Sequence, residues 1–382
     1  MDGIPVTESG KISPRQRVQA ALNKQHVDRV PVFMWYHPRT LHRLSRLLEV
    51  PVSQVSLAMG DDIRQTWVNN NVSLEAMAIP EGESQRDAWG ISWARFGDFN
   101  QIETYPLLSA SDAELSAASF PYEHVEELLA PMIEINRLKD AYFTGCDISP
   151  CVFEMYWRLR GHEQSMYDMI SKTAGTLNLL DHSTDFSIFL AEAATKRFSL
   201  DWIWTGDDAG SQQNMLISPA MWRDLIKPRL KRIFDVIHNL GLPVAFHSCG
   251  AIRQVIPDLI EIGMNVLNPV QGNCPGMNPL ELKKEFGDKI TFMGGVDTQE
   301  LLPKASATDV FRESVSLIEG MTADGGGYIL AASHTIPPET PDENIFALYR
   351  AAGISQEEIM DRAAGIRATD QNKPSHVAPR CE

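Results

Sequence analysis

The sequence predicts an α/β protein that folds as a single (β/α)8 barrel with helical and hairpin decorations near its amino terminus. Short apolar runs typical of buried strands recur along the chain, and each ends on polar or glycine-rich residues and is followed by a helical pattern. Because repeated strand–helix units place their strands parallel through right-handed crossovers, a closed barrel is the simplest arrangement. The runs are Val30–Trp35, Ala141–Cys146, Trp202–Thr205, Pro243–Phe246, Asn265–Val270, Ile290–Met293 and Tyr328–Ala331.

The barrel is expected to form one domain over residues 13–366. Ser13 followed by Pro14 is typical of a helix start, because serine caps free backbone N–H groups and proline fits the first helical position. Residues 1–12 precede this start and are predicted to be a flexible arm. Residues 367–382 have no apolar period and are predicted to be a flexible tail.

Other local signals mark further helices and a hairpin. Helices are predicted to begin at Ser218-Pro219 and at Asn278-Pro279. Pro228 is expected to kink or split the first of these, because proline has no backbone N–H to donate. Residues 340–343 (Thr-Pro-Asp-Glu) are interpreted as a capping box with proline at the first helical position. The alternation over residues 86–105 indicates an antiparallel hairpin near the barrel mouth.

The composition of the 382 residues, 43% hydrophobic and 22% charged, is typical of a soluble globular protein. The net charge of −16, without a basic patch, argues against nucleic acid and anionic membranes as partners. The sequence has no signal peptide and no apolar run near the roughly 20 residues that span a membrane, so we expect a cytoplasmic protein. Its five cysteines are too few for a disulfide scaffold and are expected to be thiols or metal ligands.

Polar residues gather where the predicted strands end. In a parallel barrel the active site is built at the carboxyl ends of the strands, so these positions are the candidates for chemistry. They are Asp147, Asp207, Asp208, His247, Cys249, Gln271, Asp297 and His334.

The segment His247-Ser248-Cys249 gives the sharpest signal. On an extended segment residues i and i+2 point the same way, so the imidazole and the thiol share one face while Gly250 lets the chain turn. Both groups are zinc ligands, although a buried cysteine beside a hydrogen-bonded histidine is the alternative. A third ligand would come from His334 or Cys274, and His334 is equally suited to a core or general-acid role.

Carboxylates and aromatic residues complete the candidate site. Asp207 and Asp208 follow a very apolar strand and suit a general base, a carboxylate that orients a histidine ligand, or a cation-binding pair. Glu154 is interpreted as either catalytic or part of a structural ion pair. Trp35 and Tyr36 could form the wall of an aromatic pocket, although aromatic residues more often belong to a core.

These motifs, in this order and spacing, resemble the uroporphyrinogen decarboxylase superfamily over about residues 14–365. The resemblance implies a (β/α)8 barrel and an active site at the carboxyl ends of its strands. The segments that carry it are His247–Gly250, Gly294–Thr298, Gly325–Leu330, His334 and Pro341–Asn344.

One branch of the superfamily comprises metal-independent decarboxylases, which bind a tetrapyrrole that carries many carboxylates. Their first strand ends in an arginine-rich loop, where this sequence keeps Arg39 but has Trp35 in place of the first arginine. Asp62 matches an acidic residue after the next helix. Because the missing arginine would remove a bidentate contact to a carboxylate, the resemblance argues against uroporphyrinogen as the substrate.

The other branch comprises corrinoid-dependent methyltransferases, whose zinc is held by a His-x-Cys pair and a later cysteine. The pair is present as His247 and Cys249, and His334 stands at the position of the later cysteine. We therefore expect His334 as third ligand ahead of Cys274, whose loop contains glycine and proline and is expected to direct it to the surface. The segment Gly206–Gln212 resembles a subgroup associated with demethylation of methoxylated or methylated small compounds.

The sequence therefore predicts a zinc-dependent methyltransferase. It would move a methyl group between a small methoxylated or methylated compound, or a thiol or folate acceptor, and a corrinoid (cobalamin) carried by a partner protein. The rivals are a metal-independent carboxy-lyase and a ligand-binding barrel without catalysis, and a homodimer is possible. The predicted catalytic residues are Asp207, Asp208, Glu154 and His334, and the predicted substrate-binding residues are Trp35, Tyr36, Arg39, Asp62, Gln271 and Asp297.

Overall fold

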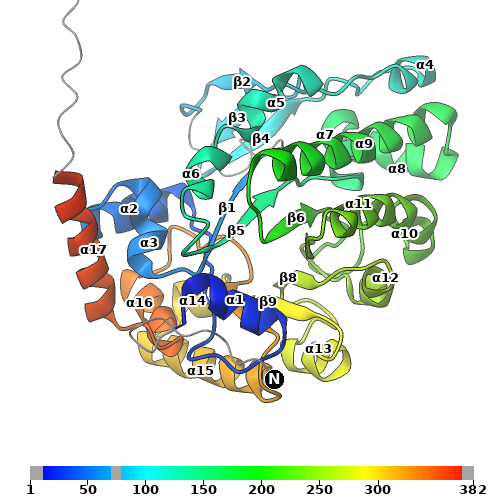
Figure 1. Cartoon of the computed structure of the whole chain (residues 1–382). Coiled ribbons are helices and arrows are strands. Elements are labelled where there is room, and N and C mark those ends of the chain that lie inside the picture. The colour runs from blue at the N-terminus through cyan, green and yellow to red at the C-terminus, as the bar shows by residue number, and fades with distance from the viewer. Residues whose placement is uncertain (1–11, 70–78, 372–382) are drawn as a thin grey trace, which may run out of the picture.

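The computed structural model describes residues 12–69 and 79–371. Within these residues the central feature is a parallel sheet of seven strands, which follow one another around the sheet in chain order (Figure 1). The strands are β1 (Ile63–Trp67), β5 (Phe143–Asp147), β6 (Trp202–Gly206), β7 (Val244–His247), β8 (Val266–Val270), β9 (Thr291–Val296) and β10 (Tyr328–Ala332).

The segment 30–36 closes this sheet into a barrel. Leu330 of β10 donates its N–H to the Pro31 carbonyl at 2.8 Å, and the Phe33 N–H returns to the Leu330 carbonyl at 3.1 Å. On the other side of the segment, the Val32 carbonyl accepts a hydrogen bond of 2.8 Å from the Asp62 N–H at the start of β1. This segment, called the first stave because it precedes β1 in the chain, brings the number of barrel strands to eight, and the predicted (β/α)8 barrel is confirmed.

Strand β1 was not predicted, because three of its five residues are polar: Arg64, Gln65 and Thr66. The predicted antiparallel hairpin is present beside the barrel and has three strands in the described chain: β2 (Ser84–Arg86), β3 (Ser92–Phe96) and β4 (Phe99–Thr104). Helix α1 (Pro14–Leu22) precedes the barrel and packs against β1, β5 and β10, so it covers the amino-terminal end.

The remaining helices follow the strands and surround the barrel (Figure 1). After the first stave and β1 come α2 (Pro38–Leu48), α3 (Val55–Met59), α4 (Asp112–Ser116), α5 (Val125–Leu129) and α6 (Met132–Asn136). After β5 and β6 come α7 (Phe153–Arg160), α8 (His162–Ser171), α9 (Ala174–Arg197), α10 (Pro219–Leu225) and α11 (Lys227–Asn239). After the last four strands come α12 (Ile256–Glu261), α13 (Pro279–Phe286), α14 (Leu301–Lys304), α15 (Ala307–Thr322), α16 (Asp342–Ala351) and α17 (Gln356–Gln371).

Most of the helix boundaries agree with the sequence signals. Ser13, Ser218 and Asn278 each cap the helix that follows. Helix α10 ends before Pro228 and α11 begins at Lys227, so the predicted split is confirmed.

The prediction of a capping box at residues 340–343 is wrong. Pro341 occupies the cap position, so the Thr340 hydroxyl lies one residue too early and is buried with no hydrogen-bond partner among the described residues. Helix α17 runs five residues into the segment expected as a tail, whereas residues 1–11 and 372–382 lie outside the described residues. No helix of the described part is long and apolar enough to cross a membrane.

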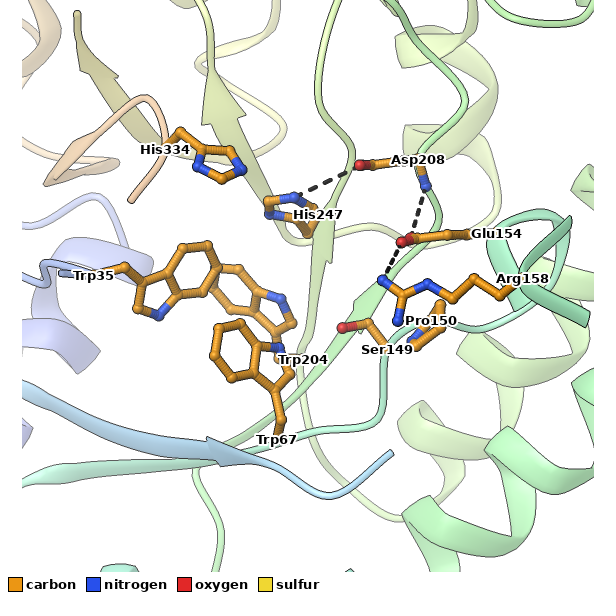
Figure 2. Close-up of a pocket in the computed structure, with 10 residues that line it drawn as sticks. All are labelled: Trp35, Trp67, Ser149, Pro150, Glu154, Arg158, Trp204, Asp208, His247 and His334. Atoms are coloured by element: carbon orange, nitrogen blue, oxygen red, sulfur yellow. Dashed lines mark hydrogen bonds and ion pairs between the residues drawn. The ribbon is translucent and has the colours of Figure 1, made fainter. Parts of the chain in front are cut away.

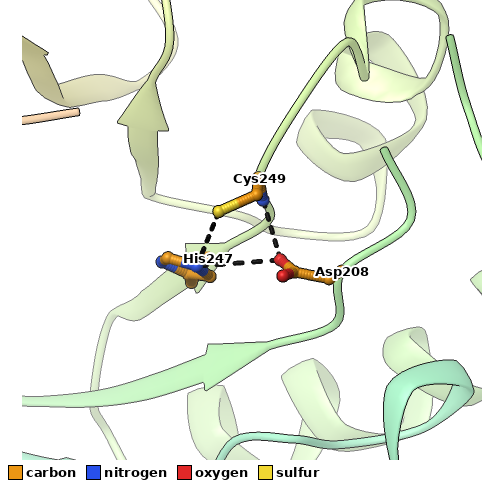
Figure 3. Close-up of side chains that lie close together, drawn as sticks. All are labelled: Asp208, His247 and Cys249. Atoms are coloured by element: carbon orange, nitrogen blue, oxygen red, sulfur yellow. Dashed lines mark hydrogen bonds and ion pairs between the residues drawn. The ribbon is translucent and has the colours of Figure 1, made fainter. Parts of the chain in front are cut away.

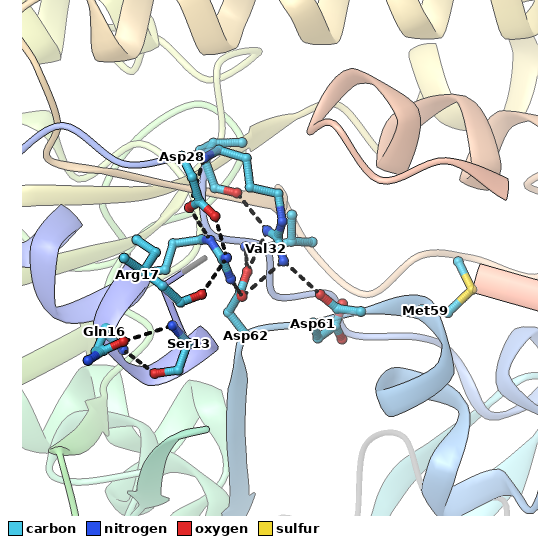
Figure 4. Close-up of polar contacts among 12 residues, drawn as sticks. Ser13, Gln16, Arg17, Asp28, Val32, Met59, Asp61 and Asp62 are labelled. Carbon is cyan, nitrogen blue, oxygen red and sulfur yellow. Dashed lines mark hydrogen bonds and ion pairs between the residues drawn. The ribbon is translucent and has the colours of Figure 1, made fainter. Parts of the chain in front are cut away.

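The amino-terminal end of the barrel is closed by apolar packing and a buried ion-pair cluster. Val18 of α1 joins inward-facing strand residues in one apolar cluster. Next to it, the fully buried Asp62 carboxylate accepts hydrogen bonds from Arg17 (2.6 Å), Arg29 (2.7 Å) and the Val32 N–H (2.8 Å) (Figure 4). Asp62 thus lies at the opposite end of the barrel from His247, which corrects the expectation that it binds substrate.

A second buried cluster fastens α16 to the first stave. The Tyr36 and Tyr349 hydroxyl oxygens are 2.5 Å apart, and the Tyr349 hydroxyl also donates to the Asp61 carboxylate. Burial raises the pKa of Asp61 to about 7. Because alternate strand residues face opposite sides, Tyr36 faces outward while Trp35 faces the interior. This corrects the expectation that Tyr36 lines the pocket.

The Asp61 cluster predicts a pH-dependent stability. Between about pH 4 and pH 7 the folded protein holds a proton that the unfolded chain has released, so the free energy of unfolding falls as the pH rises. In Asp61→Asn this decrease in the free energy of unfolding should be smaller than in the wild type by up to roughly 4 kcal/mol. Urea unfolding at several pH values measures the difference. The exposed Asp361→Asn is the control, and an Asp61→Asn profile parallel to the wild type would contradict the account.

Candidate functional site

A pocket of about 70 Å³ opens at the carboxyl ends of the strands (Figure 2). Its walls come from the first stave, the ends of β1, β6 and β7, the loops after β5, β6 and β10, and helix α7. It therefore lies where a parallel barrel builds its active site. The lining residues are Trp35, Trp67, Ser149, Pro150, Glu154, Arg158, Trp204, Asp208, His247 and His334.

Three tryptophans form one side of the pocket. The Trp35 ring centroid lies 5.4 Å from that of Trp67 and 5.2 Å from that of Trp204. The Trp35 ring also contacts His247, with centroids 5.6 Å apart. Because the rings contact one another, they form a continuous apolar wall, which excludes water from that side of the imidazole.

Asp208, His247 and Cys249 bring their ligand atoms within 4.8 Å of one another (Figure 3). His247 Nε2 lies 3.5 Å from Cys249 Sγ and 3.7 Å from Asp208 Oδ1. A tetrahedral zinc with bonds of about 2.0–2.3 Å separates its ligand atoms by roughly 3.3–3.7 Å. The imidazole, thiol and carboxylate thus fit a zinc ion in both chemistry and spacing.

Asn268 orients the imidazole. Its Oδ1 lies 2.8 Å from His247 Nδ1, and its Nδ2 donates to the Met293 carbonyl at 3.4 Å. Since an amide oxygen only accepts hydrogen bonds, the histidine proton sits on Nδ1. The Nε2 lone pair is then directed toward Cys249 and Asp208. Asn268 thus orients His247 in the way that the hydrogen-bonding partner of a metal-bound histidine does.

The loops after β6 and β7 touch backbone to backbone, which places Asp208 beside Cys249. A Cβ atom on Gly210 would lie 2.5 Å from the Cys249 carbonyl oxygen, and one on Gly250 would lie 2.5 Å from the Ser211 carbonyl oxygen. Gly250 also has a φ of +82°, which other residues rarely adopt. The Cys249 N–H donates to Asp208 Oδ1 at 2.8 Å and fixes the pair.

Glu154 of α7 holds the loop that carries Asp208. Its Oε2 accepts a hydrogen bond from the Asp208 N–H at 3.3 Å, and its Oε1 accepts one from Arg158 Nη2 at 2.6 Å. Burial raises the pKa of Glu154 above its ordinary value, and the Arg158 charge opposes this shift. Glu154 therefore lines the pocket and also positions Asp208.

Asp207 does not reach the pocket, although it was predicted as catalytic. It is fully buried, and its Oδ1 accepts the backbone N–H groups of Glu154 (2.8 Å) and Val152 (3.2 Å) at the start of α7. Burial raises the pKa of this carboxyl to about 7. Because neighbouring residues of an extended chain face opposite sides, Asp208 faces the pocket and Asp207 faces away from it. The prediction for Asp207 is therefore corrected to a structural role.

Gln271 links two loops instead of lining the pocket. Its Oε1 accepts the Gly250 N–H at 2.6 Å, and its Nε2 donates to the Ser333 carbonyl at 3.2 Å. It thus connects the loop of Cys249 to the loop of His334. This corrects its predicted role in substrate binding to a role in positioning.

Two further substrate-binding predictions are corrected by the placement of the side chains. The Asp297 carboxylate accepts N–H groups of the turn that follows, including that of Gln299 at 2.9 Å, and it lines a separate groove. Arg39 is exposed and pairs with Asp98 at 2.5 Å, so the hairpin region and not the pocket neutralises its charge.

His334 and Cys274 were the two candidates for the third ligand. His334 lines the pocket with His247, but it is not part of the cluster of three ligand residues. Cys274 is buried, not directed to the surface, because its turn folds back: its N–H donates to the Gln271 carbonyl at 2.9 Å. Its Sγ lies 3.7 Å from Gln271 Oε1, and burial raises the pKa of the thiol.

Ser149 and Pro150 of the pocket were not predicted from the sequence, and neither were four further residues of the site. Trp67 lies on the strand that was not predicted. Trp204 was seen only as part of an apolar strand, although its alternation with Trp202 indicates one shared face. Arg158 is four residues after Glu154, a spacing that indicates an ion pair on one helix face. Asn268 pairs in register with His247, which requires knowledge of the strand order.

Comparisons with known proteins agree with this architecture. The family model described as uroporphyrinogen decarboxylase (URO-D) matches residues 133–353, more than half of the chain. A uroporphyrinogen decarboxylase of Thermus thermophilus is 30% identical over 130 residues, which are 34% of this chain and 35% of that protein. A methylcobamide:CoM methyltransferase MtaA of Methanosarcina barkeri is 27% identical over 184 residues, 48% of this chain and 50% of that protein.

The similarity to these two curated relatives thus spans about a third to a half of their length. Among solved structures, a methyltransferase from Methanosarcina mazei superposes with a TM-score of 0.63 at 21% identity, covering 90% of this chain and 99% of that one. This likeness shows the fold. The family match over residues 133–353, more than half of the chain, establishes that the chain belongs to the uroporphyrinogen decarboxylase family.

Proposed function

We propose that the protein is a zinc-dependent methyltransferase that moves a methyl group between a small methoxylated or methylated compound and a corrinoid. The observation that carries this proposal is the convergence of Asp208, His247 and Cys249 at the pocket. The similarity to a methylcobamide:CoM methyltransferase supports the same class of reaction. The acceptor or donor on the substrate side would be a heteroatom such as a phenol oxygen or a thiol.

The zinc ligands in this proposal are His247, Cys249 and Asp208, with Asp208 in the place that the sequence assigned to His334. Asp208 Oδ1 lies 3.7 Å from His247 Nε2, the separation expected for two ligands of one ion. Three protein ligands leave one position for the substrate, as in catalytic zinc sites. When bound, the zinc would supply a Lewis acid that stabilises the substrate heteroatom as an anion.

The protein side chains around this position have separate tasks. Asn268 holds the His247 tautomer, and Glu154 holds the loop of Asp208. The wall formed by Trp35 keeps water from one side of the pocket. His334 lines the pocket, where its imidazole would hold or release the proton of the substrate heteroatom.

A corrinoid would supply the cobalt centre that accepts or donates the methyl group. We propose that a partner protein carries it to the mouth of the barrel. In the demethylating direction the bond between the heteroatom and the methyl carbon would break, the heteroatom would keep that electron pair, and the reduced corrinoid would provide the electron pair for the new bond to the methyl carbon. The task of this chain is then to hold the heteroatom and its proton in place.

Decarboxylation is the rival reaction, favoured by the similarity to the Thermus thermophilus decarboxylase. One observation argues against it. Arg39, the counterpart of a family arginine, pairs with Asp98 outside the pocket.

The zinc ligands can be tested by substitution and metal analysis. Wild-type protein should hold close to one zinc per chain, and His247→Ala and Cys249→Ala should each lose it while the circular dichroism spectrum is unchanged. Asp208→Asn should weaken zinc binding, because it removes the negative ligand, whereas Cys274→Ala is the matched thiol control and should keep the metal. Zinc retained in Asp208→Asn but lost in His334→Ala would return the third position to His334.

The reaction class can be tested with cob(I)alamin and ultraviolet–visible spectroscopy. Zinc-loaded protein should convert cob(I)alamin to methylcobalamin with at least one compound of a panel of methoxylated aromatics, methylamines and thioethers. Cys249→Ala should show no conversion. Saturable binding of a panel compound without any spectral change would identify a binding protein, and release of carbon dioxide by metal-free protein would identify a decarboxylase.

A further inference from the structure

The barrel has an open seam between the first stave and β1. Asp62 donates its N–H to the Val32 carbonyl at the start of β1, but no further backbone hydrogen bond joins the two in the described part of the chain. A cavity of about 280 Å³ lies in this seam. Its lining includes Ser53, which is exposed at the protein surface, and Asp147 at the end of β5. Solvent can therefore approach Asp147 from the side of the barrel.

Asp147 is a buried carboxyl group that lines this seam cavity. It is 1% exposed, and its Oδ1 accepts hydrogen bonds from the Ser149 hydroxyl (2.5 Å) and the Ser149 N–H (2.8 Å), whereas its Oδ2 has no partner among the described residues. Burial raises the pKa of Asp147 well above its ordinary value, and the charges of Glu154 and Arg158 on α7 act on it in opposite directions. Because an ionised carboxylate is costly to bury, Asp147 is protonated at neutral pH and carries its proton on Oδ2.

Ser149 connects Asp147 to the pocket that His247 lines. It lines the same pocket, and Figure 2 shows its hydroxyl oxygen directed into it. A Cβ atom on Gly206 would lie 2.8 Å from Ser149 Cβ and 3.4 Å from His247 Cβ, so the serine and the histidine lie beside the same glycine. Since the Ser149 hydroxyl donates to Asp147, its oxygen can still accept a proton from a group in the pocket. The two side chains thus form a hydrogen-bonded chain between the pocket and the seam cavity.

We propose that Ser149 and Asp147 form a proton relay that carries the proton of the substrate heteroatom from the pocket to solvent. This inference rests on the proposed zinc site, where a thiol or hydroxyl group that binds as an anion must release its proton. That proton passes to Ser149 Oγ, the hydroxyl proton of Ser149 passes to Asp147 Oδ1, and the proton on Asp147 Oδ2 passes to water in the seam cavity. Rotation of the two groups restores the starting arrangement. In the demethylating direction the same chain runs backwards and returns a proton to the heteroatom.

The position of the seam cavity explains why such a relay is useful. The cavity opens on the side of the barrel, where it is bordered by Leu41 of α2, Ser56 of α3 and Ile135 of α6. A partner protein at the mouth of the barrel would separate the pocket from solvent but would leave this side open. His334 can hold a proton within the pocket, whereas Asp147 also borders a cavity that reaches the surface.

The relay can be tested by the rate at which a thiol binds to the cobalt(II)-substituted protein. 2-Mercaptoethanol should give a sulfur-to-cobalt charge-transfer band, which stopped-flow spectroscopy follows at about pH 6.5, where the free thiol is protonated. Asp147→Asn and Ser149→Ala should each slow the appearance of this band by about 100-fold, the lower end for a positioned group that transfers protons. The equilibrium affinity should keep its wild-type value, because a relay changes the rate of proton transfer and not its equilibrium. A high concentration of MES buffer should restore part of the lost rate by carrying the proton through the open mouth.

Two control variants have matched chemistry. Asp61→Asn removes another buried carboxyl group, and Ser183→Ala removes another buried hydroxyl, which donates to the Cys151 carbonyl. Both should bind the thiol at the wild-type rate. Wild-type rates in Asp147→Asn and Ser149→Ala, or slow rates that the buffer does not restore, would overturn the relay. Absence of the band in the wild type would overturn it together with the metal site, whereas a working relay without methyl transfer to cob(I)alamin would refute only the proposed reaction.

The protonation of Asp147 can be measured without any metal. The infrared spectrum of the wild type minus that of Asp147→Asn, at neutral pH, should contain the C=O stretch of a protonated carboxyl group. Bands of an ionised carboxylate in its place would contradict the proposal, because an ionised Asp147 has no proton on Oδ2 to release. If Asp147→Asn fails to fold, the rate of thiol binding in Ser149→Ala decides.

Discussion

The backbone contact between the loops after β6 and β7 is the constraint on which the site depends. Gly210 lies against the Cys249 carbonyl and Gly250 against the Ser211 carbonyl, at distances that exclude any side chain. This contact brings a carboxylate and a thiol from neighbouring strands together, and the Cys249 N–H bond to Asp208 fixes their spacing. His247 lies beside this pair because it ends β7, two residues before Cys249.

Supports from two sides keep this arrangement in place. From β8, Asn268 sets the His247 tautomer, and Gln271 links the Cys249 loop to the loop of His334. From α7, Glu154 holds the Asp208 loop, and its bond to Arg158 brings a cation to the pocket. Rigid elements with interlocked hydrogen bonds thus carry the site, which is how a binding geometry is held before substrate arrives.

The sequence predicted the barrel because the strands of a (β/α)8 fold are short apolar runs with punctuated helices between them. It predicted His247 and Cys249 because their spacing on one strand end needs no knowledge of the tertiary structure. It failed where the tertiary structure decides. The strand β1 was missed because three of its five residues are polar. Asp62 and Tyr36 were assigned to the pocket, although Asp62 lies at the other end of the barrel and Tyr36 on its outer face.

The central claim is that one thiolate and one imidazole of this pocket hold a zinc ion together with an oxygen ligand. Zinc K-edge X-ray absorption of the wild-type protein tests it most directly. The ligand set of Cys249, His247 and Asp208 should give one sulfur at about 2.3 Å and nitrogen or oxygen ligands at about 2.0–2.1 Å. Two sulfurs in the first shell would show that Cys274 enters the site, and a shell without sulfur would contradict the assignment of Cys249.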